Sequence, residues 1–507
     1  MSARLPLGRR FAALLVTTLS VSMALLVATD GNLAIALGPA LAGLMAVALW
    51  RLPMRLTAHA MLFLALLMDN PSERPGRGLY TSLVYLPGTF LYLPLEKSLK
   101  LAGLKMTGLE ALVLLLGVLI GLRLLSGDPV DGQARPRAAL PVLRSAWVAM
   151  ISLLVLEGYG MGRGGSFNHS MLQIRTMLFM PGLALLFAYA FKSRRDIGPL
   201  LFTLLSVAYL RGLMCIYYYL TFMRHQPGGA GGQDGDGSYV TTHSDSILAA
   251  VALVICIAQI YQRPSSRSYL LAAWVVPVVS LGVVFNNRRI AFVSVAVGLA
   301  FSYLAGPSPF RRRIERTVIA LIPVLLLYTA VGWNAAGSWA KPVQSLKSVV
   351  QQKDTSSATR DVENYNLLKT LEQHPLSGSG FGHQYLELVH AFDISTIFEA
   401  YRYVPHNSIL WFWGVGGVLG FTLFWQFLAV VVFMAARLCR SAQGHREVLL
   451  GMTCITAVGA YAMQSFGDMG MMSWMGSLIV AACSGMVASL AVKSGAWVNL
   501  QATRRQG

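Results

Sequence analysis

Long runs of apolar residues recur from one end of this chain to the other. Many reach about 17 residues or more, the length at which a helix crosses roughly 30 Å of hydrocarbon. Continuous stretches such as Leu248–Ile260 and Val418–Ala436 do not fit the alternating pattern of membrane barrel strands. Charged residues make up 12% of the 507 residues, against about 25% in a soluble domain. The sequence therefore predicts an all-α, polytopic transmembrane helical bundle.

We expect about 12–14 membrane spans, because the third of the fourteen candidate runs is short. Residues 79–100 carry Pro87 and Pro94 among aromatic residues, which is typical of a re-entrant or interfacial segment. The candidate spans lie near 11–28, 32–50, 56–68, 108–125, 141–157, 173–191, 197–222, 246–262, 268–286, 290–305, 317–333, 408–436, 447–466 and 471–492.

The net charge of +19 would suggest a nucleic-acid partner in a soluble protein. Here most basic residues lie in one alternating set of loops between the spans, so membrane topology explains the excess and no nucleic acid is expected. The positive-inside rule then places both termini in the cytoplasm. The basic stretch 69–107 is an exception to the alternation.

The opposite face carries two long polar stretches. Arg224–Asp245 is rich in glycine, and the second stretch, of about 70 residues, is too long for a plain connector. A helical pattern near Ser357–Gln373 makes that second stretch partly helical. We therefore divide the chain into transmembrane helices at 1–333, an external loop at 334–407 and C-terminal transmembrane helices at 408–507.

Three arginines are not explained by topology. Arg288 and Arg289 lie in a tight external turn, against the positive-inside rule, where they either snorkel to the interface or bind an anion. The planar guanidinium fork suits phosphate. Arg211 lies inside the span 197–222 and must face a cavity or a partner, for example Glu157 in a structural pair.

Two residues of the external loop complete the candidate set. Arg360 begins the helical stretch and would by itself be read as a solvated charge. His406 ends the loop directly before a glycine-rich apolar run. Imidazole has an ordinary pKa near 6.5 and can take a proton at neutral pH. Capping of the following helix is the alternative role for His406.

The sequence indicates neither a metal nor a cofactor. The five cysteines lie within or at the end of apolar runs and form no CxxC pair. His243 with Asp245 is the nearest approach to a metal-ligand pair. No Walker loop or strand-linked GxGxxG is present, so a nucleotide-driven transporter is not indicated.

Three motifs, taken in order, resemble the O-antigen ligase and Wzy-type polymerase superfamily. They are Asn287-Arg288-Arg289-Ile290-Ala291, then Arg360 followed by His374-Pro375-Leu376-x-Gly-x-Gly-Phe-Gly, and finally His406-Asn407-Ser408-x-Leu-x-x-x-Gly-Val-x-Gly. The resemblance spans roughly residues 245–436. Asn287 stands where the family pattern usually has serine, and Arg289 stands where it has a small residue. Which of the paired arginines is functional therefore stays open, with Arg288 favoured.

The resemblance implies an inverting, metal-independent glycosyltransferase on the periplasmic side of a bacterial inner membrane. Its donor would be a glycan on undecaprenyl diphosphate. Its acceptor would be lipid A–core in lipopolysaccharide ligation, or a lipid-linked glycan in O-antigen or exopolysaccharide polymerisation. His406 would be the catalytic base, and the substrate diphosphate would be bound by Arg288, Arg289, Arg360 and Arg211. A non-catalytic polysaccharide or lipid transporter and a protein O-glycan ligase remain the alternatives.

Overall fold

The computed structural model describes residues 7–28, 31, 33–71, 84–98, 105–126, 138–222, 241–286, 289–335, 338–340, 343–344, 347, 355–390, 400–442 and 444–499. The chain divides into two compact units. The first comprises Met1–Met61 and Met68–Arg135, and the second comprises Leu62–Leu67 and Pro136–Gly507.

In the first unit, α1 packs on α2, while α6 contacts both α2 and α4. Arg123 of α6 is buried and donates a hydrogen bond of 2.5 Å to the carbonyl oxygen of Trp50, near the end of α2. The expected interfacial segment at 79–100 contains two short helices. The helices of this part of the chain are α1 (Leu7–Ala28), α2 (Leu33–Arg51), α3 (Met54–Leu67, shared with the second unit), α4 (Tyr85–Tyr92), α5 (Leu95–Ser98) and α6 (Gly108–Ser126).

The second unit holds the remaining spans and the helix of the long loop. Its helices are α7 (Leu140–Gly162), α8 (Phe167–Ala190), α9 (Ile197–Thr221), α10 (Asp245–Gln262), α11 (Ser266–Asn286), α12 (Arg289–Ala305), α13 (Ser308–Gly332), α15 (Thr355–Gln373), α16 (Ser408–Ser441), α17 (His445–Gly467) and α18 (Trp474–Lys493). Short 3-10 turns lie at Arg194–Asp196, Ser338–Ala340 and Gly470–Met472.

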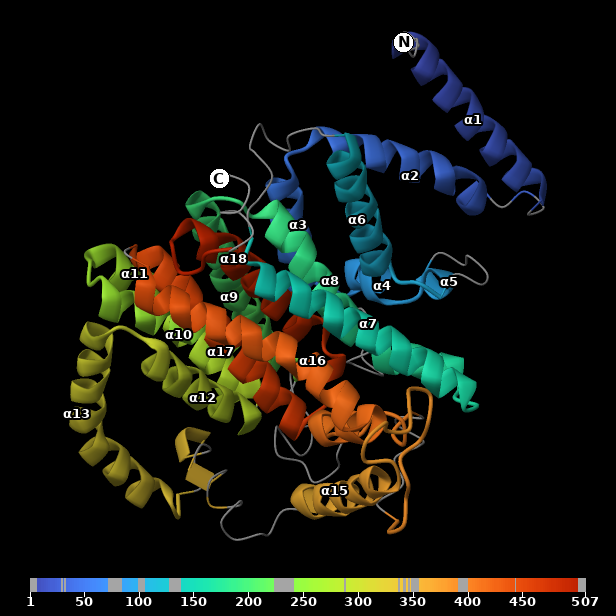
Figure 1. Ribbon diagram of the computed structural model, residues 1–507. Helices are drawn as coiled ribbons and strands as arrows, with labels where there is room; N and C mark the ends of the chain where they lie inside the picture. Colours follow the sequence, from blue (N-terminus) through green and yellow to red (C-terminus); the bar gives the residue numbers. More distant parts are fainter. Residues whose placement is uncertain are drawn as a thin grey trace. The chain divides into compact units, whose positions relative to one another are not determined.

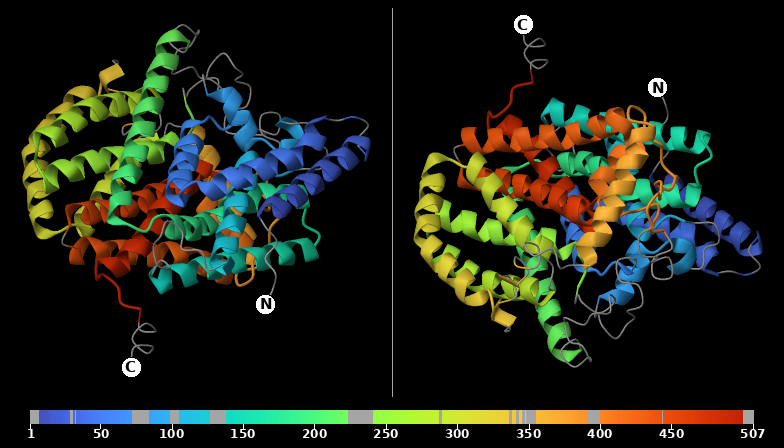
Figure 2. Two further views of the ribbon diagram at one scale, coloured as in Figure 1. Left: turned by 90° about the horizontal axis from the view of Figure 1, so that it is seen from above. Right: turned by 90° about the horizontal axis from the view of Figure 1, so that it is seen from below.

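Helices α17 and α18 form the centre of the second unit (Figures 1 and 2). In the apolar stretch of each helix, the buried share is 89% for α17 and 94% for α18, whereas it is 0% for α13. Helix α17 packs on α10, α12 and α16, and α18 packs on α8. A Cβ at Gly485 of α18 would lie 2.6 Å from the carbonyl oxygen of Ala184. The missing side chain therefore lets these two helices approach closely, as small residues do in membrane bundles.

Every expected span coincides with a helix. Within the described residues, ten helices are long and apolar enough to cross a membrane, and four shorter apolar helices correspond to the other four spans. Helix α15 begins two residues before the expected helical stretch of the long loop and ends at the same residue. The prediction of an all-α polytopic bundle is confirmed, and the protein is a multi-pass membrane protein.

Helix α16 is broken near its beginning, at Gly417, which has φ 57° and ψ −170°. A Cβ there would lie 2.3 Å from the carbonyl oxygen of Leu376. Gly378, with φ 70°, shows the reverse relation, because its Cβ would lie 2.0 Å from the carbonyl oxygen of Val415. Both positions thus require glycine for backbone conformation and for space.

The segment 375–380 satisfies backbone groups at this break. The N–H of Ser379 donates to the carbonyl oxygen of Gly414 at 3.1 Å, and that of Gly380 donates to the carbonyl oxygen of Val415 at 2.9 Å. In the opposite direction, the N–H of Val418, just after the break, donates to the carbonyl oxygen of Pro375 at 2.9 Å. Unpaired backbone groups are costly where they are buried, as at Gly378, Gly380 and Val415, so this pairing stabilises the break. The glycine-rich parts of the second and third motifs therefore fit together as one backbone unit, which we call the glycine interlock.

Candidate functional site

His406 is held against α15 by Glu363. The buried Glu363 carboxylate accepts hydrogen bonds from the backbone N–H of His406 at 3.2 Å to each oxygen. The Nδ1 atom of the ring lies 3.3 Å from Oε2. Asn407 caps α16, since its side chain accepts from the N–H of Leu410 at 3.1 Å. The cap is therefore Asn407, and the imidazole of His406 is left for another role.

The surroundings of His406 set its proton affinity. Burial lowers the pKa of the imidazole, but the hydrogen bond and the charge of Glu363, together with the charge of Asp468, outweigh burial. The nearby Arg360 guanidinium acts in the lowering direction. The net result is a pKa raised from the ordinary value of 6.5. With Nδ1–H donating to Glu363, the Nε2 lone pair is left to accept a proton.

Arg360 lies on the same face of α15 as Glu363, because residues three apart on a helix are neighbours. It is half-buried. In the part of the chain that the structure describes, no carboxylate forms an ion pair with Arg360. The positive charge of Arg360 is close enough to His406 to lower the pKa of the imidazole.

Asp468, directly after α17, connects His406 to a second segment. Its carboxylate is buried and contacts Nδ1 of His243. Gln464 donates to the same carboxylate at 3.3 Å. The hydroxyl of Ser408 donates to the carbonyl oxygen of Asp468 at 3.0 Å. The end of α17 therefore joins the start of α16 to the residues that precede α10.

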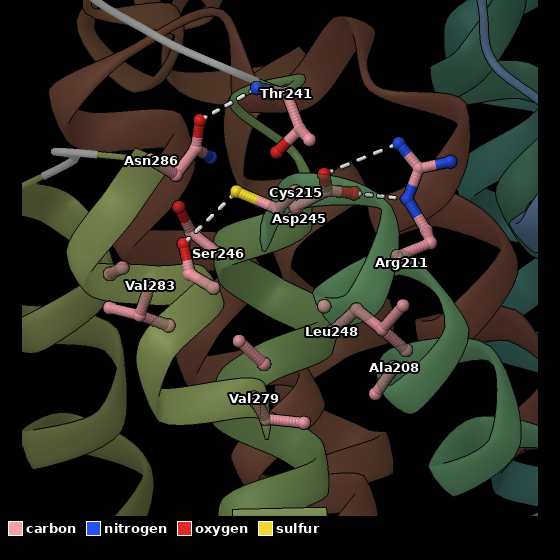
Figure 3. A pocket seen from close by; sticks show the side chains of 14 residues that line it. Ala208, Arg211, Cys215, Thr241, Asp245, Ser246, Leu248, Val279, Val283 and Asn286 are labelled. Carbon is pink, nitrogen blue, oxygen red and sulfur yellow. Dashed lines mark hydrogen bonds and ion pairs between the residues drawn. The ribbon is translucent and has the colours of Figure 1, made fainter. Parts of the chain in front are cut away.

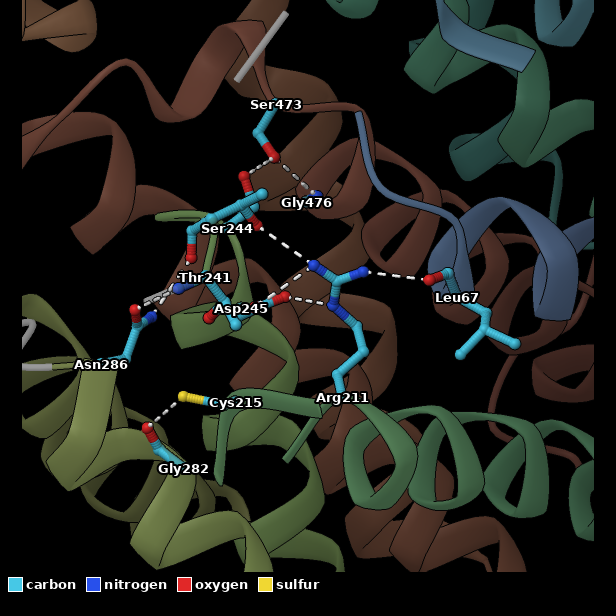
Figure 4. Close-up of polar contacts among 11 residues, drawn as sticks. Leu67, Arg211, Cys215, Thr241, Ser244, Asp245, Gly282, Asn286, Ser473 and Gly476 are labelled. Atoms are coloured by element: carbon cyan, nitrogen blue, oxygen red, sulfur yellow. Dashed lines mark hydrogen bonds and ion pairs between the residues drawn. The ribbon is translucent and has the colours of Figure 1, made fainter. Parts of the chain in front are cut away.

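Asn286, the last residue of α11, extends this network (Figure 4). Its side-chain oxygen accepts from the N–H of Thr241 at 2.9 Å, and its amide donates to the carbonyl oxygen of Thr242 at 3.3 Å. Arg288 lies outside the described residues, and only the backbone of Arg289, at the start of α12, is described. Both arginines closely follow Asn286 in the sequence, and Asn286 contacts the segment that precedes His243.

Arg211 is enclosed by hydrogen bonds (Figures 3 and 4). It is 4% exposed, and its Nε lies 2.5 Å from Oδ1 of Asp245. One Nη donates to the carbonyl oxygen of Leu67 at 3.1 Å, and the other lies 3.3 Å from Oδ2 of Asp245. The adjoining cavity measures about 30 Å³, enough for a water molecule or two but too small for a diphosphate.

The partner of Arg211 therefore differs from the Glu157 considered above. Glu157 instead accepts a hydrogen bond of 2.7 Å from the hydroxyl of Ser170. Asp245 is the first residue of α10 and does not belong to the glycine-rich loop. Because α9 packs on α10, Asp245 lies beside Arg211 and takes the place expected for Glu157. An acidic residue in the first turn is also favoured by the helix dipole.

Among the described residues, no group of three or more His, Cys, Asp or Glu side chains is placed to hold a metal ion. His243 and Asp245, the residues of the sequence that come nearest to a metal-ligand pair, contact different partners. His243 contacts Asp468, and Asp245 pairs with Arg211.

A second cavity, of about 450 Å³, lies between the end of α7, the C-terminal part of α15 and the loop that follows it. Arg163 reaches into this region and lies 3.0 Å from Nε2 of His374. Across the cavity, Arg402 pairs with Glu387 at 2.5 Å. The lining is rich in hydrogen-bonding groups, which suits a polar ligand with many hydroxyls.

Two residues near His406, Glu363 and Asp468, were not predicted from the sequence. Glu363 could have been found, because it follows Arg360 by three residues in a helical stretch and so shares its face. Asp468 gave no such signal, since it is 225 residues from His243 and 60 from Ser408.

One family model matches the part of the chain that holds the His406–Glu363 pair. Residues 276–425 match the family model described as O-Antigen ligase. The match includes Arg288, Arg289, Arg360 and His406, and it ends within α16 beyond the glycine interlock. No curated protein matches the chain. The chain therefore carries, at residues 276–425, a domain similar to the O-antigen ligase family.

Proposed function

We propose that the protein transfers a glycan from undecaprenyl diphosphate to an acceptor hydroxyl at the periplasmic face of the inner membrane. The acceptor is lipid A–core or a lipid-linked glycan, so the enzyme is an O-antigen ligase or an O-antigen or exopolysaccharide polymerase. The observation that carries this proposal is the His406–Glu363 pair with Arg360 nearby, inside the matched domain.

In this proposal His406 is the general base. Its Nε2 removes the proton of the acceptor hydroxyl, and Glu363 stabilises the imidazolium that forms. The acceptor oxygen attacks the anomeric carbon from the side opposite the diphosphate, so the configuration inverts. The bond from that carbon to the diphosphate oxygen breaks, and the leaving group takes the electron pair.

Arginine supplies the charge stabilisation that this leaving group needs. Arg360 lies close enough to His406 to lower the pKa of its imidazole, and a fixed guanidinium in a poorly hydrated site stabilises developing negative charge without a metal. We propose that Arg288 and Arg289, which follow Asn286 in the sequence, bind the same diphosphate. Arg211 would reach it only by leaving Asp245, so we assign Arg211 to the support of the α10 N-terminus.

The polar cavity beside Arg163 and His374 offers a place for the glycan. Glu363 and Gln373, which lines that cavity, are ten residues apart on α15. At 1.5 Å per residue the separation is roughly 15 Å, the length of a few sugar units. We propose that sugars remote from the reacting carbon occupy this cavity.

The proposed reaction requires one orientation of the chain in the membrane. Both termini are cytoplasmic, and residues 334–407 form a periplasmic region between the transmembrane helices of 1–333 and those of 408–507. The loop charges support this orientation, because lysine and arginine are retained on the cytoplasmic side.

Deletion of the gene and analysis of the glycans tests the proposal. Full-length polymer left on the carrier lipid would identify a ligase, and single lipid-linked repeat units would identify a polymerase. Purified protein, assayed in excess chelator, should form product from lipid-linked donor and acceptor. Absence of product with active donor, together with transport of the same lipid in vesicles, would favour a transporter instead.

A further inference from the structure

A cavity of about 790 Å³ lies between α9, α10, α11 and α17, at the far end of these helices from the His406 cluster. His445, the first residue of α17, lines it, whereas Gln464 at the other end of α17 contacts Asp468. Nineteen residues of helix separate the two, or roughly 28 Å. This cavity is therefore distinct from the proposed catalytic site.

One end of this cavity is strongly basic. Arg263, Arg267 and Arg446 line it together with His445, and the lining contains no aspartate or glutamate. In the described part of the chain, none of these three arginines forms an ion pair. The neighbouring Glu447 is already paired with Arg194 at 2.5 Å. Three exposed guanidinium groups that cluster without a carboxylate in the lining make this end of the cavity attractive to an anion.

Most of the remaining lining is apolar, and part of it faces outward. Along α11, Arg267, Leu271 and Trp274 lie at spacings of four and three residues, so they share one face of the helix. Trp274 is 63% exposed, and Phe202, on the opposing helix α9, is 70% exposed. The cavity is thus charged at the helix ends and apolar toward the middle of the bundle, with its apolar part open to the surroundings.

We infer that this cavity binds an anionic phospholipid. The phosphodiester is held by Arg263, Arg267 and Arg446, and an acyl chain lies along Leu271 and Trp274. Arginine forks match phosphate oxygens, and basic pockets between transmembrane helices bind anionic headgroups. A free phosphate would use the basic end alone and would leave the apolar wall unexplained.

Lipid titration of the full-length protein in detergent, followed by native mass spectrometry, tests this inference. Phosphatidylglycerol should bind in preference to phosphatidylethanolamine. The triple variant Arg263→Gln, Arg267→Gln, Arg446→Gln should weaken phosphatidylglycerol binding about a hundredfold, on a scale of roughly fivefold per basic residue near an anionic lipid.

The matched control removes three exposed arginines of α13: Arg311→Gln, Arg312→Gln, Arg316→Gln. They lie at the same end of the bundle, because Arg313 beside them donates to the carbonyl oxygen of Tyr261 near the end of α10. This variant should retain binding. An equal loss in the control, equal binding of the two lipids, or displacement of phosphatidylglycerol by equimolar inorganic phosphate would each overturn the inference.

A fluorescence measurement tests lipid binding independently of the triple variant, in case that variant does not fold. Phosphatidylglycerol brominated on its acyl chains should quench the wild-type protein more than brominated phosphatidylethanolamine does. The excess quenching should disappear in Trp274→Phe, because that ring lines the apolar wall. Equal quenching by the two lipids, or excess quenching that survives in Trp274→Phe, would overturn the inference.

Discussion

Glu363→Gln is the sharpest test of the proposed base. The substitution keeps the shape of the side chain and removes its charge. Glu363 raises the pKa of His406, while burial and Arg360 lower it. Without the carboxylate the pKa must therefore fall. Because a general base works in its neutral form, the wild-type rate should decline as pH falls through a pKa above 6.5, and the decline in the variant should occur at lower pH.

The size of the rate loss follows from the contacts. Glu363 accepts from both the backbone and the ring of His406, and a hydrogen bond to a charged group contributes about 1.5–3 kcal/mol. At 1.36 kcal/mol per tenfold change, the loss of stabilisation of the imidazolium should slow the maximal rate about 10- to 100-fold. The KM for the donor should change little, because the arginines that bind the diphosphate are untouched.

The assay is glycan transfer by purified protein across a pH series, at equal concentrations of folded enzyme. Glu372→Gln is the matched control, since this residue is on the same helix, is 62% exposed and pairs with Lys369. Its pH profile should equal that of the wild type. If Glu363→Gln folds normally and its acid limb stays in place or moves to higher pH, the assignment of His406 as base assisted by Glu363 is refuted.

Four further results are expected. His406→Ala should lower turnover about 10²–10⁴-fold while donor binding persists. His406→Asn should be equally inactive in the transfer assay, because an amide cannot take the proton. Substantial activity of the asparagine variant would show that His406 only positions the acceptor. Arg360→Ala and Arg288→Ala should each cut polymer output steeply, with lysine restoring only part because it lacks the bidentate fork, so normal output from either alanine variant would remove its phosphate role. Gly417→Ala should destabilise the protein by roughly 1–3 kcal/mol from backbone strain, with the clash in addition, and an unchanged melting temperature in detergent would contradict the glycine interlock. A topology reporter fused near Ser356 should be active only outside the cytoplasm, and cytoplasmic activity would reverse the orientation.

The fold could be predicted to a large extent because its signals are local. A membrane span is specified by the length of its apolar run, so each expected span coincides with a helix. The stretch Ser357–Gln373 was recognisable in the same way, since its pattern ends at His374-Pro375. Proline cannot continue a helix interior, and α15 indeed ends at Gln373.

The connections within the site could not be predicted, because they depend on packing between distant helices. Glu363 and His406 are 43 residues apart, and no periodicity relates them. Arg211 had more than one acidic residue available in the sequence, and the contact of α9 with α10 selects Asp245 over Glu157. The position of the Arg288 side chain lies outside the described residues, so its role stays a prediction.

The glycine interlock also bears on how such chains can recombine. The carbonyl oxygen of Val415 lies where a side chain at Gly378 would stand, and that of Leu376 lies where one at Gly417 would stand. A crossover between these two segments would join a loop from one parent to a helix from another. If the second parent has an unbroken helix, the loop amides lose their partners, and the buried amide of Gly380 is left unpaired. Residues 375–418 should therefore be inherited as a single block, and chimaeras should be cut outside it.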